Sequence, residues 1–318
     1  MKILITGVHG FVGSNLVKYL APANEIYGLD IVAPEKEGVI KTYSWDDLDA
    51  GCVPAVDAIV HLAGKAHDTK NQAAAEVYFK VNTGLTQKMF DYFLAHSDIR
   101  KFVFFSTAKA AADKVDGVLT EDVVPAPVGP YGESKIAAER YILDKLETLN
   151  LEPETPAKQV YIFRPCMIHG PGNKGNLNLL YNVVRKGIPW PLGAFENRRT
   201  FTSVENICFA VNGVLTKDVP SGIYNMGDDE ALSTNELIEE ICKSLGKKAH
   251  IWKLPKGLMN GVANVGGLLH MPLNPERLRK LTENYISSNA KIKAALGVER
   301  MPIDAKEGLR VTLDSFKG

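Results

Sequence analysis

The sequence predicts an α/β protein built around a doubly wound parallel sheet, with a smaller C-terminal domain interleaved with it. Two observations predict this fold class. In the first half, short apolar runs alternate with segments of helical periodicity, and these runs are nearly continuous, as strands are when helices cover both faces of a sheet. After about residue 165 the alternation loosens, and proline and glycine cluster in HGPGNKGN and GIPWPLG.

The strand and helix candidates follow one another regularly along the first half of the chain. The apolar runs that predict strands are 2–7, 25–31, 58–64, 101–107 and 159–165. The segments with helical periodicity between them are 11–21, 75–96 and 131–147. Each strand followed by a helix is the unit from which a parallel sheet is built.

The domain boundary is expected near the end of the last of these strands. With 318 residues the chain is long enough for about two domains. We predict a first domain over residues 1–165, with a later strand near 200–210, and a smaller domain mainly over residues 166–318. The longest uncharged stretch, 257–273, contains four glycines, two asparagines and a proline, which favours a core or interface helix over a membrane-surface segment.

Composition narrows the classes of function. Lys+Arg and Asp+Glu are 37 each, and this balance argues against nucleic acid as the main partner. The four cysteines, at positions 52, 166, 208 and 242, form no CxxC pair, so we expect reduced thiols and no metal site. The start MKILITG is too short for a signal peptide. We therefore expect a cytoplasmic protein with no membrane partner.

A glycine-rich turn follows the first predicted strand. ITGVHGFVGSNL places Gly7, Gly10 and Gly13 in a GxxGxxG spacing at a strand-to-helix junction. Glycines permit the tight turn and the close approach of backbone to a pyrophosphate, and the helix N-terminus offers free N–H groups. A glycine turn without a ligand is the alternative. We expect Phe11 and Val12 to line the same dinucleotide site.

Two further strand ends fit a dinucleotide. Asp30 ends the second strand, where a carboxylate can accept hydrogen bonds from the adenosine ribose and would repel a 2′-phosphate, so NAD is favoured over NADP. A surface aspartate that starts a turn is the alternative interpretation. Leu62, Ala63 and Gly64 end another strand, and the small residues there would let the cofactor lie close.

The stretch PYGESK carries a tyrosine and a lysine one helical turn apart. Tyr131 and Lys135 can share a face of the predicted helix, and a nearby ammonium lowers a tyrosine pKa and suits it to acid–base chemistry. The YxxxK spacing alone is common by chance. Here Ser106 and Thr107 end the preceding strand, so hydroxyl, tyrosine, lysine and glycine loop occur in one chain.

Taken as a set, these motifs resemble those of the extended short-chain dehydrogenase/reductases, in the NAD-dependent epimerase/dehydratase family of nucleotide-sugar enzymes. The segments TGVHGFVGSNL, HLAG, FFST, YGESK, FRPCMIHGPG and NRRTFTSVENI occur in family order over nearly the whole chain. The resemblance implies a Rossmann-type first domain, a C-terminal substrate domain and NAD as cofactor. It also implies a homodimer, paired through the helices that begin near Glu76 and Tyr131, whose wide apolar faces suggest the same.

The resemblance also implies roles for the strand-end and helix residues. Tyr131 would be the acid/base, and Lys135 would hold the nicotinamide ribose and lower the tyrosine pKa. Thr107 would bond the sugar oxygen that is oxidised or reduced. Asn82 in VNTG matches an asparagine close to the cofactor.

On the substrate side, the resemblance implies a grip on a nucleoside diphosphate, as in a UDP-sugar. Asn176 and Leu177 match positions in that grip, and Phe201 lies beside it. An arginine in PERLRK, Arg277 or Arg279, is expected to reach the diphosphate as well.

Arg199 in RRTF matches the main diphosphate position. Its neighbour Arg198 is the alternative, with Arg199 then a solvated surface residue.

Departures from the family pattern bear on the reaction. Many dehydratases of the family carry an Asp-Glu pair after the threonine, but here the residues are Ala108 and Lys109, which argues against a 4,6-dehydratase. Many 4-epimerases have an asparagine where this chain has Met167. STAK, HLAGKAHD and PLGAFENRRTFTSVENI instead resemble bacterial UDP-2-acetamido-sugar 4-ketoreductases that supply surface-polysaccharide precursors.

A UDP-(N-acetyl)hexos-4-ulose reductase is therefore the first expectation, and a UDP-hexose or UDP-N-acetylhexosamine 4-epimerase is the second. A non-catalytic dinucleotide-binding protein is the alternative from another class. Lys65 and His67 are expected near the substrate, with a solvated loop as the other interpretation.

Overall fold

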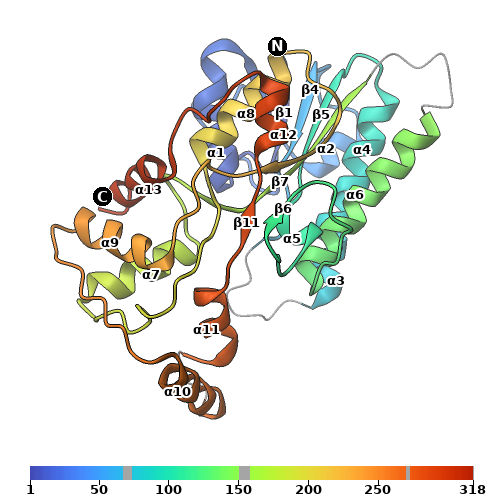
Figure 1. Ribbon diagram of the computed structural model, residues 1–318. Helices are drawn as coiled ribbons and strands as arrows, with labels where there is room; N and C mark the ends of the chain where they lie inside the picture. The colour runs from blue at the N-terminus through green and yellow to red at the C-terminus, as the bar shows by residue number, and fades with distance from the viewer. Residues whose placement is uncertain (67–73, 150–157, 270–272, 318) are drawn as a thin grey trace.

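The computed structural model describes residues 1–66, 74–149, 158–269 and 273–317 (Figure 1). Its centre is a seven-stranded sheet in the order β10-β7-β5-β4-β1-β2-β3, and every neighbouring pair is parallel. The strands are β1 (Lys2–Thr6), β2 (Glu25–Leu29), β3 (Lys41–Tyr43), β4 (Ala58–His61), β5 (Lys101–Phe105), β7 (Gln159–Pro165) and β10 (Gly222–Met226). The predicted doubly wound parallel sheet is confirmed.

Helices cover both faces of this sheet, which is why its strands are apolar on both sides. One face carries α1 (Phe11–Leu20), α8 (Val204–Thr216) and α12 (Ala290–Leu296). The other face carries α2 (Trp45–Asp49), α4 (Leu85–Ala95) and α6 (Pro130–Leu149). Along β1, Ile3 and Ile5 pack in the first layer and Leu4 in the second, and all three are fully buried.

The strand order reverses beside β1, and this reversal positions the site. From β1 the sheet grows through β2 and β3 to one side and through β4, β5, β7 and β10 to the other. In open parallel sheets a crevice forms at such a switch point, outside the carboxyl ends of the strands. Gly7 follows β1 and Leu62 follows β4, so both lie at this edge.

Much of the C-terminal part forms a second lobe with its own apolar cluster. Its helices α7 (Asn176–Arg185), α9 (Thr234–Ser244) and α13 (Ala305–Asp314) share buried side chains such as Leu237, Ile241 and Leu309. Two small parallel sheets accompany it: β8 (Met167–His169) with β9 (Phe201–Ser203), and β6 (Val118–Leu119) with β11 (Ile286–Ser287). The remaining helical elements are η1 (Ala21–Ala23), α3 (Ala75–Tyr78), the π-helix η2 (Phe79–Gly84), α5 (Ala108–Ala111), α10 (Lys256–Leu268) and α11 (Pro275–Thr282).

The two lobes interleave differently from the expectation. The strand predicted near 200–210 is β9, but it pairs with β8 and not with the large sheet. The segment directly after it is the buried helix α8, which covers one face of the large sheet. The seventh strand of that sheet is instead β10, which pairs with β7. Its short run GIYNM, with a glycine and an asparagine, gave only a weak strand signal.

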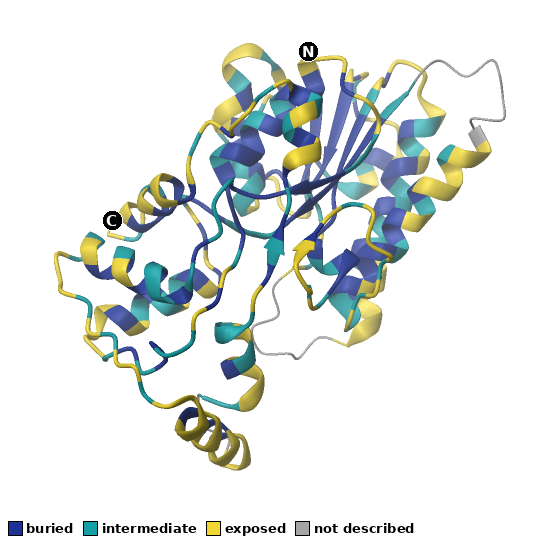
Figure 2. Cartoon of the chain, viewed as in Figure 1, coloured by how far each residue is buried: buried dark blue, intermediate teal, exposed yellow. Residues whose placement is uncertain are grey.

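Helix α10 covers most of the stretch 257–273, for which a core or interface helix was expected, and its exposure argues against the core alternative. Only Met259, Ala263 and Gly266 of α10 are buried. Apolar side chains on and just after this helix are exposed, as the yellow surface of α10 in Figure 2 shows: Leu258 (54%), Val262 (45%), Val265 (53%), Leu268 (81%) and Leu269 (66%). Within the described ranges, no helix combines the length and apolar character needed to cross a membrane.

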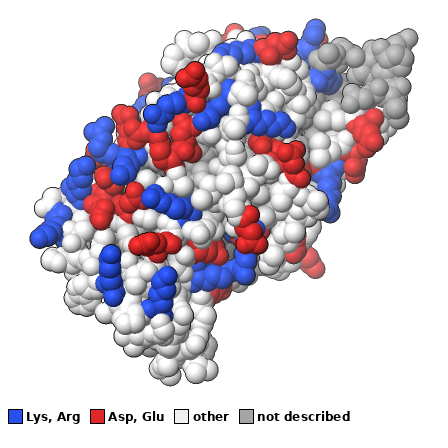
Figure 3. All heavy atoms as spheres, in the orientation of Figure 1, with Lys and Arg blue, Asp and Glu red and all other residues white. Residues whose placement is uncertain are grey.

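Surface charges of both signs are interspersed on the face drawn in Figure 3. Oppositely charged side chains of the described residues form ion pairs: Lys293 Nζ lies 2.7 Å from Asp229 Oδ1, Lys280 Nζ lies 2.6 Å from Glu276 Oε1, and Arg300 pairs with Glu230. This face therefore mixes the two signs and does not gather basic residues along one stripe.

Candidate active site

The glycine-rich turn between β1 and α1 is shaped by contacts that a side chain would block. Gly7 has a φ of +69°, in the left-handed region, and a Cβ there would lie 3.0 Å from the backbone nitrogen of Ala63. A Cβ on Gly13 would lie 2.4 Å from the carbonyl oxygen of Gly7. The backbone is therefore bare where a pyrophosphate would rest at the start of α1, and the turn fits a dinucleotide.

Asp30 directly follows β2 and lies beside this turn. Its Oδ2 accepts a hydrogen bond from the His9 backbone N–H at 3.0 Å, and its Oδ1 accepts one from the Ile31 N–H at 2.7 Å. The carboxylate is thus held next to the glycine-rich loop, where the adenosine ribose of a dinucleotide is expected.

Lys36 is a residue of this region that sequence reasoning missed. Its Nζ donates to Ser14 Oγ at 2.7 Å, at the start of α1. Burial lowers the pKa of Lys36, and the nearby charge of Asp30 opposes that shift. Five residues of irregular chain separate Lys36 from Asp30, so no periodicity in the sequence could bring the two together.

The end of β4 closes the next part of the crevice. Thr6 Oγ1 accepts hydrogen bonds from the backbone N–H groups of Leu62 (3.1 Å) and Ala63 (3.0 Å), and it also bonds His61 Nδ1 at 2.7 Å. A Cβ on Gly64 would lie 3.0 Å from an oxygen of Asn82 and 3.1 Å from Lys135 Nζ. Only glycine fits here without displacing those two polar groups.

Asn82 connects the loop after β4 to helix α6. It is fully buried in η2, a π-helix, and π-turns of this kind are frequent at functional sites. Its Oδ1 accepts from the Lys65 N–H at 2.7 Å, and its Nδ2 donates to the Lys65 carbonyl at 3.1 Å and to Ser134 Oγ at 2.9 Å. Ser134 lies between Tyr131 and Lys135 on α6, so Asn82 helps to place both.

Thr107, Tyr131 and Lys135 are brought together at the carboxyl end of β5. Thr107 caps α5, with its hydroxyl accepting from the Lys109 N–H at 3.3 Å, and it also shares a hydrogen bond with the Tyr131 side chain. Lys135 Nζ donates to the carbonyl of Phe105, the last residue of β5, at 2.7 Å. The three side chains predicted from the sequence therefore all lie by the carboxyl end of β5.

The pKa of Tyr131 differs from the expectation. Burial raises it above the ordinary value; the Thr107 hydrogen bond opposes this shift, and the nearby Tyr78 adds to it. Lys135, expected to lower the tyrosine pKa, is not among the causes. Burial lowers the pKa of Lys135 itself to about 8, against the opposing charge of Glu139. Desolvation of the buried phenol is therefore the largest influence on the Tyr131 pKa.

The side chains of Arg198 and Arg199 have different environments in the second lobe. Arg198 is exposed, and its Nη1 lies 3.0 Å from Glu236 Oε2. Arg199 is partly buried, donates to the Lys280 carbonyl, and is bridged through its backbone to Tyr285. Arg199 is therefore the inward-facing member of the pair.

Tyr285 connects Arg199 to the catalytic strand end. The Nζ of Lys109, two residues after Thr107, lies 4.7 Å from the centre of the Tyr285 ring. Cys166 directly follows β7, and burial raises its pKa to about 12. The positive charges of Arg199 and Lys109 oppose that shift, so both lie near the thiol. The Arg199 side chain thus approaches the same edge of the sheet as Thr107.

The other residues expected to bind the substrate differ in how exposed their side chains are. Asn176 is exposed at the start of α7, whereas Leu177 is buried in the second-lobe cluster and could offer only its backbone to a ligand. Phe201 is also buried, in β9. Arg277 is exposed on α11. His67 lies outside the described residues.

Arg279 already has acidic partners. Its Nη1 lies 3.3 Å from Asp113 Oδ2 and 3.8 Å from Glu283 Oε2. Lys109 Nζ lies 3.0 Å from the other oxygen of Asp113. These contacts link α11 to the loop after α5, a connection between lobes that no motif in the sequence indicated.

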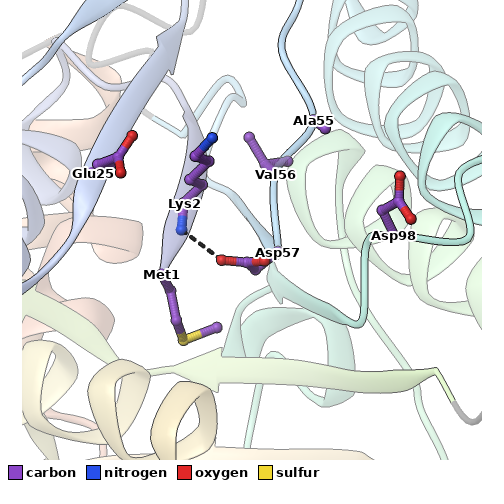
Figure 4. Close-up of a pocket in the computed structure, with 7 residues that line it drawn as sticks. All are labelled: Met1, Lys2, Glu25, Ala55, Val56, Asp57 and Asp98. Atoms are coloured by element: carbon purple, nitrogen blue, oxygen red, sulfur yellow. Dashed lines mark hydrogen bonds between the residues drawn. The ribbon is translucent and has the colours of Figure 1, made fainter.

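A hollow of about 380 Å³ lies at the opposite edge of the sheet (Figure 4). It is lined by residues that precede or begin strands, among them Lys2, Glu25, Asp57 and Asp98, and the Lys2 N–H donates to Asp57 at 2.7 Å. Because the strands are parallel, this amino-terminal edge is remote from Thr107.

A second hollow, of about 540 Å³, is lined by residues 33–37 and 39–42, with Lys36 among them. In the described ranges, no three His, Cys, Asp or Glu side chains are grouped to hold a metal ion.

Known proteins resemble the chain in sequence. UDP-glucose 4-epimerase of Vibrio cholerae is 30% identical over 274 residues, 80% of this chain and 78% of that protein. GDP-6-deoxy-D-mannose reductase of Pseudomonas aeruginosa is 23% identical over 335 residues, 99% of this chain and 97% of that protein. N-acetyl-alpha-D-glucosaminyl-diphospho-ditrans,octacis-undecaprenol 4-epimerase of Escherichia coli O157:H7 is 27% identical over 82% of this chain and 78% of that protein.

Solved structures resemble the chain in fold. UDP-glucuronic acid 4-epimerase from Bacillus cereus, solved in complex with NAD, superposes with a TM-score of 0.75 at 20% identity, over 100% of this chain and 99% of that one. Residues 3–227, which contain the glycine-rich turn, Asp30, Asn82 and the group of Thr107, Tyr131 and Lys135, match the model of the NAD dependent epimerase/dehydratase family. The resemblance seen in the motifs is confirmed, and this chain belongs to the NAD dependent epimerase/dehydratase family, whose nucleotide-sugar enzymes use NAD as cofactor.

Proposed function

We propose that this enzyme reduces the C4 ketone of a nucleoside diphosphate sugar, with a UDP-(N-acetyl)hexos-4-ulose as the substrate. The observation that carries the proposal is the grouping of Thr107, Tyr131 and Lys135 at the end of β5, beside a turn that fits NAD. NADH, when bound, supplies the hydride. The side chains of this protein hold the ketone and supply the proton.

In this reaction Thr107 and Tyr131 share the C4 oxygen. The Thr107 hydroxyl already bonds the Tyr131 side chain, so an oxygen placed between them can accept from both. Tyr131 donates its proton to that oxygen as the ketone becomes an alcohol. Because burial raises the pKa of Tyr131, the phenol is protonated at neutral pH, as a general acid requires. Lys135, held on the Phe105 carbonyl, lies where the nicotinamide ribose is expected.

The surroundings of Thr107 argue against dehydration. Elimination of water from C5 and C6 needs an acid and a base close to the sugar. The residues after Thr107 are Ala108, which is buried, and Lys109, whose ammonium bonds the carbonyl and the carboxylate of Asp113. The Asp113 carboxylate, which Lys109 contacts, is therefore already engaged by Lys109 and Arg279.

A 4-epimerase is the second candidate. It is favoured by the 30% identity to UDP-glucose 4-epimerase of Vibrio cholerae and by the fold shared with UDP-glucuronic acid 4-epimerase. Against it stands Met167, which offers no amide to a sugar hydroxyl.

The fate of the cofactor separates the two reactions. An epimerase makes the ketone and reduces it on one NAD, so the purified protein should retain NAD and consume none. A reductase must exchange its cofactor at each turnover. Mass spectrometry of nucleotide released from purified protein, followed by assay of NADH oxidation with a UDP-4-keto sugar, tests this. Retained NAD with interconversion of UDP-sugars, and no NADH oxidation, would favour the epimerase.

A protein that binds NAD(H) and turns over neither a UDP-4-keto sugar nor a UDP-hexose would contradict both candidates. That outcome would support the non-catalytic alternative, since fold alone does not determine function.

A further inference from the structure

Three consecutive residues at the end of β5 are bonded to three residues of α6 that lie one turn apart. The Phe105 carbonyl accepts from Lys135 at 2.7 Å, the Ser106 hydroxyl donates to Glu139, and Thr107 bonds Tyr131. Positions 131, 135 and 139 are spaced by four and share one side of the helix. Glu139 therefore belongs to the same row as the two catalytic residues.

Glu139 is held from a second strand by Arg164. Arg164 Nε lies 3.0 and 3.1 Å from the two carboxylate oxygens, and its Nη2 lies 2.5 Å from Oε2. Glu139 is fully buried, and Arg164, at the end of β7, is 1% exposed. A bidentate arginine–carboxylate pair has a defined geometry, and breaking a buried pair leaves an uncompensated charge. Through Glu139, α6 is thus fixed to the ends of both β5 and β7.

We propose that the buried Glu139–Arg164 pair is a positioning pair, which sets the place of α6 over the ends of β5 and β7, and that the Glu139 carboxylate is the charge partner of the Lys135 ammonium one turn away. Neither residue bonds Thr107 or Tyr131, so neither is a catalytic residue. The proposal rests on the roles proposed above for Tyr131 and Lys135.

The charges around Lys135 explain the electrostatic part of this role. The charge of Glu139 acts on it from α6, and its own charge acts on His61 of β4. Burial and the Lys135 charge lower the pKa of His61 to about 3, so the imidazole is neutral.

From β7, Arg164 adds a positive charge that is paired with Glu139. From α3, Tyr78 lies beside Tyr131, with the two ring centres 6.5 Å apart. Glu139 is therefore the carboxylate, among the described residues, whose charge opposes the loss of the Lys135 proton. Without it the Lys135 pKa, already lowered to about 8 by burial, should fall further.

Replacement of Glu139 by Gln tests this directly. The glutamine oxygen can still accept from Ser106 and Arg164, but the negative charge is gone. We expect the midpoint of the Lys135 titration to move to lower pH by about 1 unit, the effect of losing one close opposite charge. The measurement is NMR of protein labelled with [13Cε]lysine, in which the Lys135 signal is identified by its absence in Lys135→Arg. This readout does not depend on turnover.

The kinetic readout should follow the same shift. In Glu139→Gln the alkaline limit of kcat for NADH-dependent ketone reduction should move to lower pH in parallel, with KM for the sugar nucleotide little changed. Glu139→Asp retains the charge but shortens the reach to Arg164. For that variant we expect the Lys135 titration close to wild type and kcat lowered roughly tenfold to a hundredfold by misplacement of α6.

Asp228→Asn is the matched control. Asp228 is another buried carboxylate, 3% exposed, that accepts hydrogen bonds from Ser203 and Asn206 in the second lobe. Its loss should lower Tm without moving the Lys135 titration. The proposal is overturned if Glu139→Gln lowers Tm as Asp228→Asn does while the Lys135 midpoint stays at its wild-type value.

If Glu139→Gln does not fold, a wild-type Lys135 midpoint with wild-type kcat in Glu139→Asp contradicts the positioning role. A shifted Lys135 midpoint in a protein that reduces no sugar nucleotide would support the positioning pair and contradict the proposed function instead.

Discussion

Tyr131 is the residue on which the proposed chemistry depends most. It is linked to Thr107 by a hydrogen bond, and burial keeps its hydroxyl protonated by raising its pKa. We expect Tyr131→Phe to lower kcat by about 10²–10⁴, the usual effect of losing a positioned acid or base. The measurement is steady-state oxidation of NADH with a UDP-4-keto sugar.

The same variant should retain its fold and its affinity for NAD(H), because phenylalanine keeps the ring that packs edge-on against Tyr78. Circular dichroism and cofactor titration serve as controls. A rate within about a factor of two of wild type would remove Tyr131 from the role of acid.

Asp30 should determine the preference for NADH over NADPH. A 2′-phosphate on the adenosine ribose would meet the carboxylate at close range, and like charges repel. We expect Asp30→Ser to raise the affinity for NADPH relative to NADH, as measured by isothermal titration with both cofactors. Lys36 makes the test sharper, because its ammonium lies beside Asp30 and would then face the phosphate alone.

In the double variant Asp30→Ser/Lys36→Ala, the gain in NADPH affinity should therefore be smaller. An unchanged ratio of the two affinities in Asp30→Ser would mean that Asp30 only shapes the turn through His9 and Ile31.

At the scale of elements, the turn between β1 and α1 is the least tolerant of change. A Cβ at position 13 would lie 2.4 Å from the Gly7 carbonyl oxygen and 2.9 Å from the Val8 backbone, so the helix would have to move away from the strand. We expect Gly13→Ala to lower the free energy of unfolding by about 1–3 kcal/mol, the usual cost of overpacking, and to weaken NAD binding. Thermal unfolding and cofactor titration measure the two effects.

Gly257→Ala is a suitable control for this variant. Gly257 is also near the start of a helix, α10, but a Cβ there would meet nothing within 4 Å. Alanine is the better helix former, so this variant should leave stability unchanged or slightly raised. Equal stability of the Gly13→Ala protein and wild type would mean that the turn can relax around the new methyl group.

The elements that sequence could predict are those with strong local patterns. The β1–α1 turn and the YxxxK helix follow from glycine spacing, apolar runs and one-turn periodicity, and the structure places them as expected. Contacts between distant segments left no such pattern. Glu139 with Arg164, Lys36 with Ser14 and Arg279 with Asp113 are pairs formed only by folding. The direction of the Tyr131 pKa shift was missed for the same reason, since it depends on how deeply the folded chain buries the phenol.

At the scale of the whole molecule, a homodimer stays a prediction. The prediction rested on the wide apolar faces of the helices that begin near Glu76 and Tyr131. Two of those apolar side chains, Ile136 and Ile142 of α6, are buried within the monomer. Among the residues of these elements whose burial is described, the large apolar side chains that stay exposed are Val77, Phe79 and Leu143, at 41%, 37% and 39%. We expect light scattering at micromolar concentration to give a dimer mass, and Leu143→Glu to weaken it. A monomer mass for the wild type at that concentration would refute the pairing.

The two lobes should meet across the substrate, and Arg199 is the residue through which the second lobe would hold it. The catalytic trio acts on one ketone, so much of the binding energy must come from the rest of the substrate. A diphosphate concentrates negative charge, and the planar fork of arginine suits phosphate oxygens. Arg199 faces inward beside Tyr285, over whose ring Lys109 lies. We therefore expect Arg199→Ala to weaken UDP binding by roughly 1.5–3 kcal/mol, with NAD affinity barely changed.

Paired titrations of UDP and NAD into each protein test this prediction, with Arg198→Ala as the matched control. Arg198 has the same side chain one position earlier, but it is exposed and paired with Glu236, so its loss should leave both affinities near wild type. If UDP binding falls in Arg198→Ala and not in Arg199→Ala, the diphosphate is held from the outer side of the lobe. If Arg199→Ala weakens NAD and not UDP, the arginine belongs to the cofactor side, and the substrate must enter between the lobes by another face.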